Sequence, residues 1–178
     1  MTDQQTAPVT RLWTREGFRE DEWSHAESAA ALAGNGCFIL PSEVLLELDP
    51  AERRLVRERL GVLLQPGDQI EPVVDLLGEI ALVALAFPAF SDGRSFSKAQ
   101  LLRSRHGFSG ALRATGQVLV DQLPHMLRVG FDEFEIADPV LLKRLEEKRL
   151  DGLPLFYQPA AVPGAKAGGY SWRHVAAD

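Results

Sequence analysis

Short apolar runs alternate along the chain with longer segments of mixed polarity, a pattern that indicates strands followed by helices. In the clearest run, residues 81–87, every residue is apolar. A strand that is apolar on both faces is typical of a parallel sheet covered by helices. The pattern predicts five strands, at residues 37–41, 62–64, 81–87, 111–115 and 131–136.

Two of the predicted helices begin at a strong local signal. Asp49-Pro50 and Asp138-Pro139 each place a capping carboxylate before a proline at the first helical position. The predicted helices lie at residues 49–60, 72–78, 119–129 and 138–149, with one more that Ser95 or Ser97 caps and that ends at Gly107.

The alternation predicts an α/β fold, a single domain of repeated βα units whose mainly parallel sheet is open or forms a partial barrel. A closed eight-fold barrel needs about 250 residues, and this chain has 178. We expect a disordered N-terminus at residues 1–9, the domain at 10–157 and a flexible tail at 158–178. Residues 11–23 are expected to form a hairpin or an extended arm. Exposed strand edges invite pairing with another chain, so a homodimer is expected.

The composition is ordinary for a globular protein, with 46% hydrophobic and 25% charged residues. The net charge of −6 argues against general affinity for nucleic acid or for anionic membranes. No apolar run approaches the roughly 18 residues that a membrane span requires, and the first residues do not resemble a signal peptide. A cytoplasmic location is therefore expected.

The charge is unevenly distributed along the chain. Residues 91–113 carry a net charge of +4, so the remainder carries −10. A basic stretch in an acidic protein is a candidate anion site, and this one begins where the apolar strand 81–87 ends. The cationic residues of the stretch are Arg94, Lys98, Arg103, Arg105 and Arg113.

Ligands of parallel α/β sheets bind at the carboxyl ends of the strands, where Asp92 and Arg94 are predicted to lie. One interpretation is an anion clamp, in which Arg94 supplies a fork of donors beside the next helix. The alternative is a structural turn, in which Arg94 pairs with Asp92. Arg113 is either a ligand contact or the partner of a carboxylate. The candidate anion-binding residues are Asp92, Gly93, Arg94, Ser95, Ser97, Arg113, Gly116, Gln117, Asp121 and Gln122.

No metal site and no cofactor are predicted. The four histidines do not fall in a metal-binding spacing, and Cys37 is the only cysteine, which excludes an intrachain disulfide. The sequence has no glycine-rich dinucleotide fingerprint, phosphate-binding loop or nucleophile-elbow motif. No catalytic residue can be assigned, and whether the protein is an enzyme stays open.

Several stretches resemble a bacterial family of unknown function. They lie at residues 87–103, 107–116, 121–122 and 128–134, within a region of similarity that spans about 36–148. Members of that family are encoded beside assimilatory sulfite reductase genes and are often labelled oxidoreductases of sulfite reduction. They often carry a cysteine where Val129 stands and an aromatic residue near Pro124. The resemblance implies a pathway and no catalytic residue.

Three interpretations follow. The first is an accessory protein of assimilatory sulfite or sulfate reduction that binds sulfite reductase or another pathway protein. The second is a small enzyme or anion-binding module for sulfite, sulfate or an adenylated sulfate, which the basic stretch would suit. The third is an oxidoreductase with its own cofactor, which depends on the family label alone.

Overall fold

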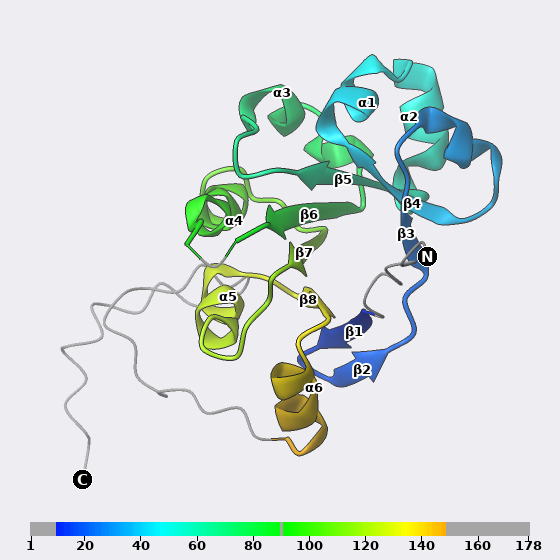
Figure 1. The fold of residues 1–178 in the computed structure, drawn as a ribbon. Helices are drawn as coiled ribbons and strands as arrows, with labels where there is room; N and C mark the ends of the chain where they lie inside the picture. The colour runs from blue at the N-terminus through cyan, green and yellow to red at the C-terminus, as the bar shows by residue number, and fades with distance from the viewer. Residues whose placement is uncertain (1–9, 90, 149–178) are drawn as a thin grey trace, which may run out of the picture.

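A computed structural model describes residues 10–89 and 91–148. The fold is α/β, and eight strands of these described residues form one curled sheet that resembles half of a barrel (Figure 1). The strands follow the order β2-β1-β8-β7-β6-β5-β4-β3 across the sheet. They are β1 (Arg11–Thr14), β2 (Gly17–Arg19), β3 (Trp23–His25), β4 (Cys37–Pro41), β5 (Leu60–Leu64), β6 (Leu82–Phe87), β7 (Ala111–Gly116) and β8 (Glu133–Ile136).

Most of the sheet is parallel, as the sequence predicts. Strands β3 to β8 all run in one direction, whereas β1 pairs antiparallel with both β8 and β2. The α-helices are α1 (Ser42–Glu47), α2 (Pro50–Val56), α3 (Glu71–Val74), α4 (Arg94–Ser104), α5 (Leu123–Val129) and α6 (Pro139–Glu146). No α-helix separates β1, β2 and β3, so a βα unit repeated along the whole domain is not confirmed.

The first three strands are the main difference from the sequence prediction. The hairpin expected in residues 11–23 is present as β1 and β2, and it extends the sheet beyond β8. The chain then crosses to the far edge, where β3 pairs with β4. Each of these strands has three or four residues. So short a run has too few positions for a periodic pattern to be recognised.

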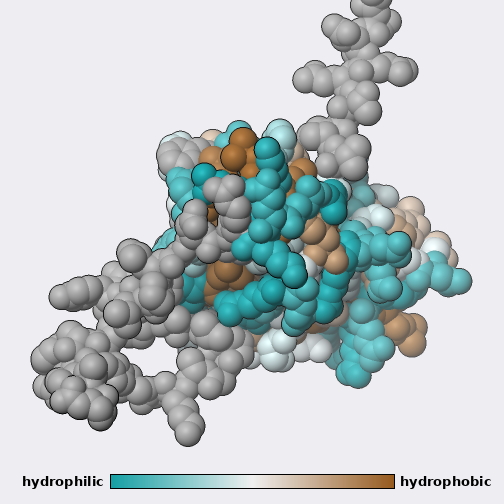
Figure 2. Space-filling view, turned by 90° about the horizontal axis from the view of Figure 1, so that it is seen from below, coloured by the Kyte–Doolittle hydropathy of each residue, from teal (hydrophilic) through white to brown (hydrophobic). Residues whose placement is uncertain are grey.

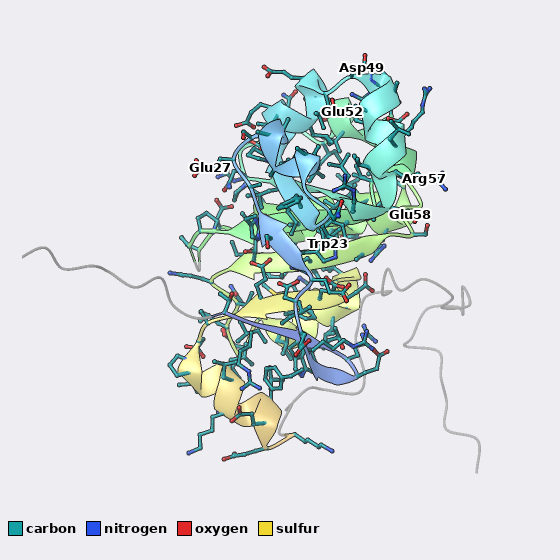
Figure 3. The ribbon with its side chains drawn as sticks, turned by 90° about the vertical axis from the view of Figure 1, so that its right-hand side faces the viewer. Trp23, Glu27, Asp49, Glu52, Arg57 and Glu58 are labelled. Carbon is teal, nitrogen blue, oxygen red and sulfur yellow. The ribbon has the colours of Figure 1, made fainter. Side chains whose placement is uncertain are left out.

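Helices cover one face of the sheet. Residues Val83, Leu85 and Phe87 of β6 belong to the large core cluster that also contains the buried residues of the helices. The alternate residues of β6, Leu82 and Ala84, lie on the concave face. The prediction of helical cover is therefore correct for the outer face only. On the inner face, Trp23 of β3 (labelled in Figure 3) packs against the cluster of Ile39, Leu82 and Ala84.

The two aspartate caps are confirmed. The Asp49 carboxylate accepts a hydrogen bond of 2.8 Å from the Ala51 N–H, and Asp138 accepts one of 2.7 Å from Leu141. The serine cap of α4 is wrong, because Gly93 occupies the cap position and the Ser95 hydroxyl donates to the Ala86 carbonyl at 2.6 Å.

Helix α5 begins later than predicted. Its cap is Gln122, so Pro124 falls in the first turn, where a proline is tolerated. Within the described residues, no helix is both long and apolar enough to cross a bilayer. The disordered segment expected at 1–9 and the flexible tail expected at 158–178 both lie outside the described residues.

Candidate functional site

Asp92 and Arg94 follow β6 at the carboxyl edge of the parallel strands, as predicted. The Asp92 carboxylate accepts hydrogen bonds from Arg94 Nε at 3.0 Å and from Arg94 Nη2 at 2.7 Å. It also accepts one from the Arg94 backbone N–H at 3.2 Å. These bonds from Arg94 lower the pKa of Asp92 below its ordinary value. The Arg94 side chain is 64% exposed, so the pair lies at the surface.

The residues around this pair are arranged by the start of α4. Gly93 is exposed at the helix cap, and Ser97 is exposed in the first turns. Ser95 is buried, and its hydroxyl is already bonded to the Ala86 carbonyl. Of the two serines offered as anion donors, Ser97 therefore has the exposed side chain.

Strand β7 ends beside β6 in a tight connection. Gly116 has a φ of +93°, and a Cβ at this position would lie 2.5 Å from the Phe87 carbonyl oxygen. The next N–H, of Gln117, donates to that same oxygen at 2.7 Å. Gly116 thus allows β7 to leave the sheet against the end of β6. Gln117 and Asp121 are exposed beyond this turn, and Gln122 is half-buried.

His125 also lies near this carboxyl edge of the sheet. The sequence analysis did not identify it as a site residue. Its ring lies 4.7 Å from that of Phe96, between centroids, and Phe96 packs edge-on against Phe87 at 5.0 Å. Burial, with a smaller effect from the charge of Arg128, lowers the pKa of His125 below its ordinary value. The available signal was Pro124, which opens the helix after β7 and so places His125 near the carboxyl ends of the strands.

Two further cations of the basic stretch, Lys98 and Arg103, donate hydrogen bonds to backbone carbonyls of neighbouring loops. The Lys98 ammonium donates to the carbonyls of Gln65 and Pro66, the latter at 2.9 Å. Burial lowers the pKa of Lys98 below its ordinary value. Arg103 donates to the carbonyls of Gly130 and Gly110 at 3.0 and 2.8 Å, and to the carboxylate of Asp132. Most of the positive charge is thus already engaged by acceptors of the protein.

Arg113 is separate from the edge and lies on the concave face of the sheet. It is fully buried and forms ion pairs with Asp21, Glu133 and Glu135. Its guanidinium donates to Glu133 at 2.9 and 2.7 Å and to both oxygens of Asp21 at 2.9 and 3.0 Å. A third acceptor, Glu135, lies at 3.1 Å. The sequence alternative of a carboxylate-paired arginine is the arrangement that the structure contains.

Glu135 extends this cluster toward β3. Its carboxylate lies 2.8 Å from His25 Nε2 and accepts a hydrogen bond of 2.6 Å from the Thr115 hydroxyl. Burial works to raise the pKa of Glu135, but the bonds from His25 and Thr115 and the charges of His25 and Arg113 outweigh it and lower the pKa. Sequence analysis gave no reason to join these residues, because β8 and β3 lie at distant places in the chain.

The candidate residues therefore form two groups. One is exposed at the carboxyl edge and contains the Asp92–Arg94 pair; the other is buried around Arg113 and is saturated with protein partners. In the part of the chain that the structure describes, no three His, Cys, Asp or Glu side chains are arranged to hold a metal ion.

Comparison with known proteins gives one family. The description "Bacterial protein of unknown function (DUF934)" matches residues 61–166, more than half of the chain. The protein belongs to this family. The matched region begins at residue 61, later than the resemblance recognised in the sequence, and extends to residue 166. The family description names no activity, ligand or partner, and a search of curated proteins finds no match.

Proposed function

We propose that this protein is an accessory protein of assimilatory sulfite or sulfate reduction, which acts by binding sulfite reductase or a neighbouring enzyme of the pathway. The observation that carries the proposal is the resemblance at residues 87–103 and in the later stretches to a family encoded beside sulfite reductase genes. Membership of the bacterial family agrees with the resemblance.

The described geometry favours binding a protein over binding an anion. The donors of Arg94, Lys98, Arg103 and Arg113 are bonded to carboxylates or carbonyls of the chain. An oxyanion at these side chains must displace a protein acceptor. Binding another protein at the surface of this chain does not require these hydrogen bonds to be broken.

Growth of a deletion strain tests the pathway. The strain should grow normally on cysteine and poorly on sulfate or sulfite, and the intact gene should restore growth. The tagged full chain, purified from cells grown on sulfate, should retain sulfite reductase or another enzyme of the pathway. Equal growth on all three sulfur sources would contradict the proposal, as would repeated purification without any pathway enzyme.

The second candidate is an anion-binding enzyme for a sulfur oxyanion or an adenylated sulfate. One observation favours it: the Arg94 side chain, which pairs with the half-buried Asp92 beyond the carboxyl end of β6, is 64% exposed. An ion pair at the surface contributes little to the folding free energy, typically below about 1 kcal/mol. An oxyanion could therefore replace the Asp92 carboxylate as the partner of the Arg94 guanidinium.

Calorimetric titration with sulfite, sulfate and adenylyl sulfate separates the two candidates. The enzyme candidate requires binding that Arg94→Ala abolishes and that Arg105→Ala keeps. Arg105 is a matched control because it is exposed just beyond the opposite end of α4. If Arg94→Ala also restores growth of the deletion strain as well as the intact gene does, the accessory role stands without the anion site.

A homodimer also stays a proposal. The edges of the sheet are β2 and β3, and an unpaired edge is where a second copy would add. Light scattering at micromolar concentration should give twice the mass of the chain. A monomeric mass would contradict it.

A further inference from the structure

Three carboxylates surround Arg113 on the concave face of the sheet, and they differ in how the fold holds them. Glu133 and Glu135 belong to β8, which pairs with β1 and β7. Asp21 belongs to residues 20–22, a crossing segment without helical or strand structure that links β2 to β3 (Figure 1). The Asp21 side chain is 30% exposed, against 22% for Glu133 and 8% for Glu135. Asp21 is therefore the partner that solvent reaches most, and it lies outside the sheet.

The hydrogen bonds of Arg113 divide between β8 and the crossing segment. A guanidinium has five N–H donors, and three of those of Arg113 donate to β8. Nε and Nη2 donate to Glu133 at 2.9 and 2.7 Å, and Nη1 donates to Glu135 at 3.1 Å. The remaining two, one on each terminal nitrogen, donate to Asp21 at 2.9 and 3.0 Å. Without Asp21, two donors would lie side by side on a guanidinium that β8 still positions, as two-point recognition of a carboxylate requires.

The charges around Arg113 limit what can replace Asp21. Without Asp21, one arginine faces two glutamates, which gives −1 before any contribution from the His25 that pairs with Glu135. A monoanion in the place of Asp21 restores the charge that the folded protein already accommodates. A dianion such as sulfate adds a further negative charge in a partly buried place, where salt screens repulsion only weakly. The site therefore favours a singly charged carboxylate.

The crossing segment can move while the strands on both sides of it stay paired. Strand β2 pairs with β1 before it, and β3 pairs with β4 after it. The Trp23 indole also packs over Gly61, where an added Cβ would lie 3.1 Å from the ring. The Trp23 backbone N–H donates to Asp21 Oδ1 at 3.1 Å. Displacing the Asp21 carboxylate thus breaks this bond and the two bonds from Arg113, and leaves the strand pairs in place.

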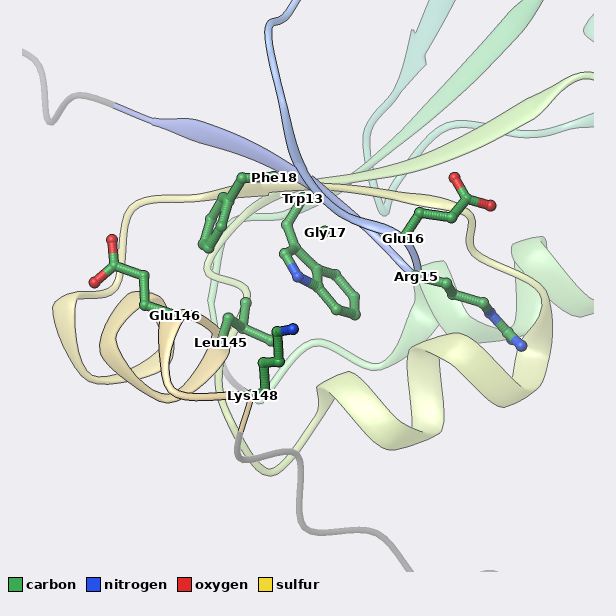
Figure 4. Close-up of a pocket in the computed structure, with 8 residues that line it drawn as sticks. All are labelled: Trp13, Arg15, Glu16, Gly17, Phe18, Leu145, Glu146 and Lys148. Carbon is green, nitrogen blue, oxygen red and sulfur yellow. The ribbon is translucent and has the colours of Figure 1, made fainter.

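The hollow beside the β1–β2 hairpin is a poorer place for a ligand. It has a volume of about 620 Å³ between the hairpin and α6 (Figure 4). Its apolar lining is largely covered, because Trp13 and Leu145 are each 6% exposed and the Phe18 ring lies 4.0 Å from the Arg11 guanidinium. Seen from below, the described surface is mainly hydrophilic with smaller hydrophobic patches (Figure 2). Arg113, in contrast, offers a specific pair of donors.

We propose that Asp21 is a built-in competitor at a carboxylate-binding site on Arg113. The crossing segment closes this site, and a small molecule opens it when its carboxylate replaces that of Asp21 on the guanidinium. Because Asp21 is tethered, its effective concentration is roughly millimolar, so a ligand that offers only a carboxylate binds the intact protein weakly. The inference goes beyond the proposed function and does not depend on it.

Chemical rescue of Asp21→Ala in the full-length chain tests the site. Acetate or formate should raise the Tm of this variant saturably, by about 2–4 °C relative to equal concentrations of chloride. Glu16→Ala is the matched control, because it also frees an arginine, Arg19, but at the surface. Its Tm should be the same in acetate as in chloride. If Asp21→Ala is unfolded at room temperature, acetate should refold it, which circular dichroism measures.

Two results of this rescue experiment would overturn the proposal. The first is an equal effect of acetate on Asp21→Ala and Glu16→Ala, or no effect on either. The second is a rescue of Asp21→Ala by sulfate that matches the rescue by acetate at equal ionic strength, since the site would then not select a single charge.

The intact protein tests the competition. The Trp23 backbone N–H loses its acceptor when a carboxylate displaces Asp21, so its NMR resonance should shift as acetate is added. The midpoint of this shift should need at least about tenfold more acetate than the rescue of Asp21→Ala, because Asp21 competes. The Ala51 N–H, which donates to Asp49 at 2.8 Å, is the control and should not shift. A Trp23 resonance that stays in place while Asp21→Ala is rescued would overturn the role of Asp21 as a displaceable competitor.

Discussion

Arg113 of β7 and Asp21, which precedes β3, form a two-point ion pair although 92 positions separate them in the chain. The pair connects the middle of the sheet to the segment that crosses its concave face. Trp23 and His25 follow Asp21. Trp23 packs against the cluster of Ile39, Leu82 and Ala84, and His25 pairs with Glu135. The inner face of the half-barrel is therefore closed by residues 21–25 and contains a buried charge cluster.

Removing the cation of this cluster should be severely destabilising. Arg113→Met leaves Asp21, Glu133 and Glu135 without their shared partner, and breaking a buried pair from one side costs about 3–5 kcal/mol. Urea denaturation should show this loss of unfolding free energy. The control is Arg19→Met, which breaks the exposed pair with Glu16 and should cost no more than about 1 kcal/mol. Similar losses in both variants would contradict a special role for the buried cluster.

Acid should weaken the fold partly through Glu135. Because its pKa in the folded protein is lower than its ordinary value of 4.5, its stabilisation is present above that value and is lost as the pH falls through the folded pKa. Glu135→Gln should therefore be less stable than wild type at pH 7, and the gap should shrink as the pH falls below 4.5. Denaturation at a series of pH values measures the gap. A constant gap for Glu135→Gln would refute the prediction.

The turn after β7 should not accept a side chain. Gly116→Ala places a Cβ 2.5 Å from the Phe87 carbonyl oxygen and at a positive φ, so a loss of more than about 2 kcal/mol is expected. Gly67→Ala is the control, because a Cβ there meets nothing within 4 Å. Thermal unfolding of the two variants distinguishes them. An equally stable Gly116→Ala protein would show that the connection between β6 and β7 can relax.

The N-terminal cap of α6 should depend on a side-chain oxygen at residue 138 that accepts a hydrogen bond. Asp138→Ala removes the acceptor of the Leu141 N–H and should cost about 1 kcal/mol, whereas Asp138→Asn retains an oxygen and should cost much less. Chemical denaturation of both variants tests this. If the two lose the same free energy, the loss comes from charge and not from the hydrogen bond.

Features that depend on neighbouring residues were predictable. A proline after an aspartate fixes the start of a helix through one backbone angle and one hydrogen bond two or three residues away, as at Asp49 and Asp138. The apolar run that forms β6 likewise identifies a strand buried on both faces. The position of Asp92 and Arg94 at the carboxyl edge followed from the direction of that strand.

Only the tertiary structure decided what covers the inner face and what Arg113 does. Both depend on contacts between residues far apart in the chain: Arg113 with Asp21, and Glu135 with His25 across 110 positions. Such contacts result from the curl of the sheet, which brings Asp21 to Arg113 of β7 and His25 to Glu135 of β8. The sequence by itself determined the α/β class, the mainly parallel strands and the capped helices, because local backbone preferences and hydrophobic periodicity specify these. The packing of one sheet face against a short, weakly patterned segment is specified by the whole chain at once.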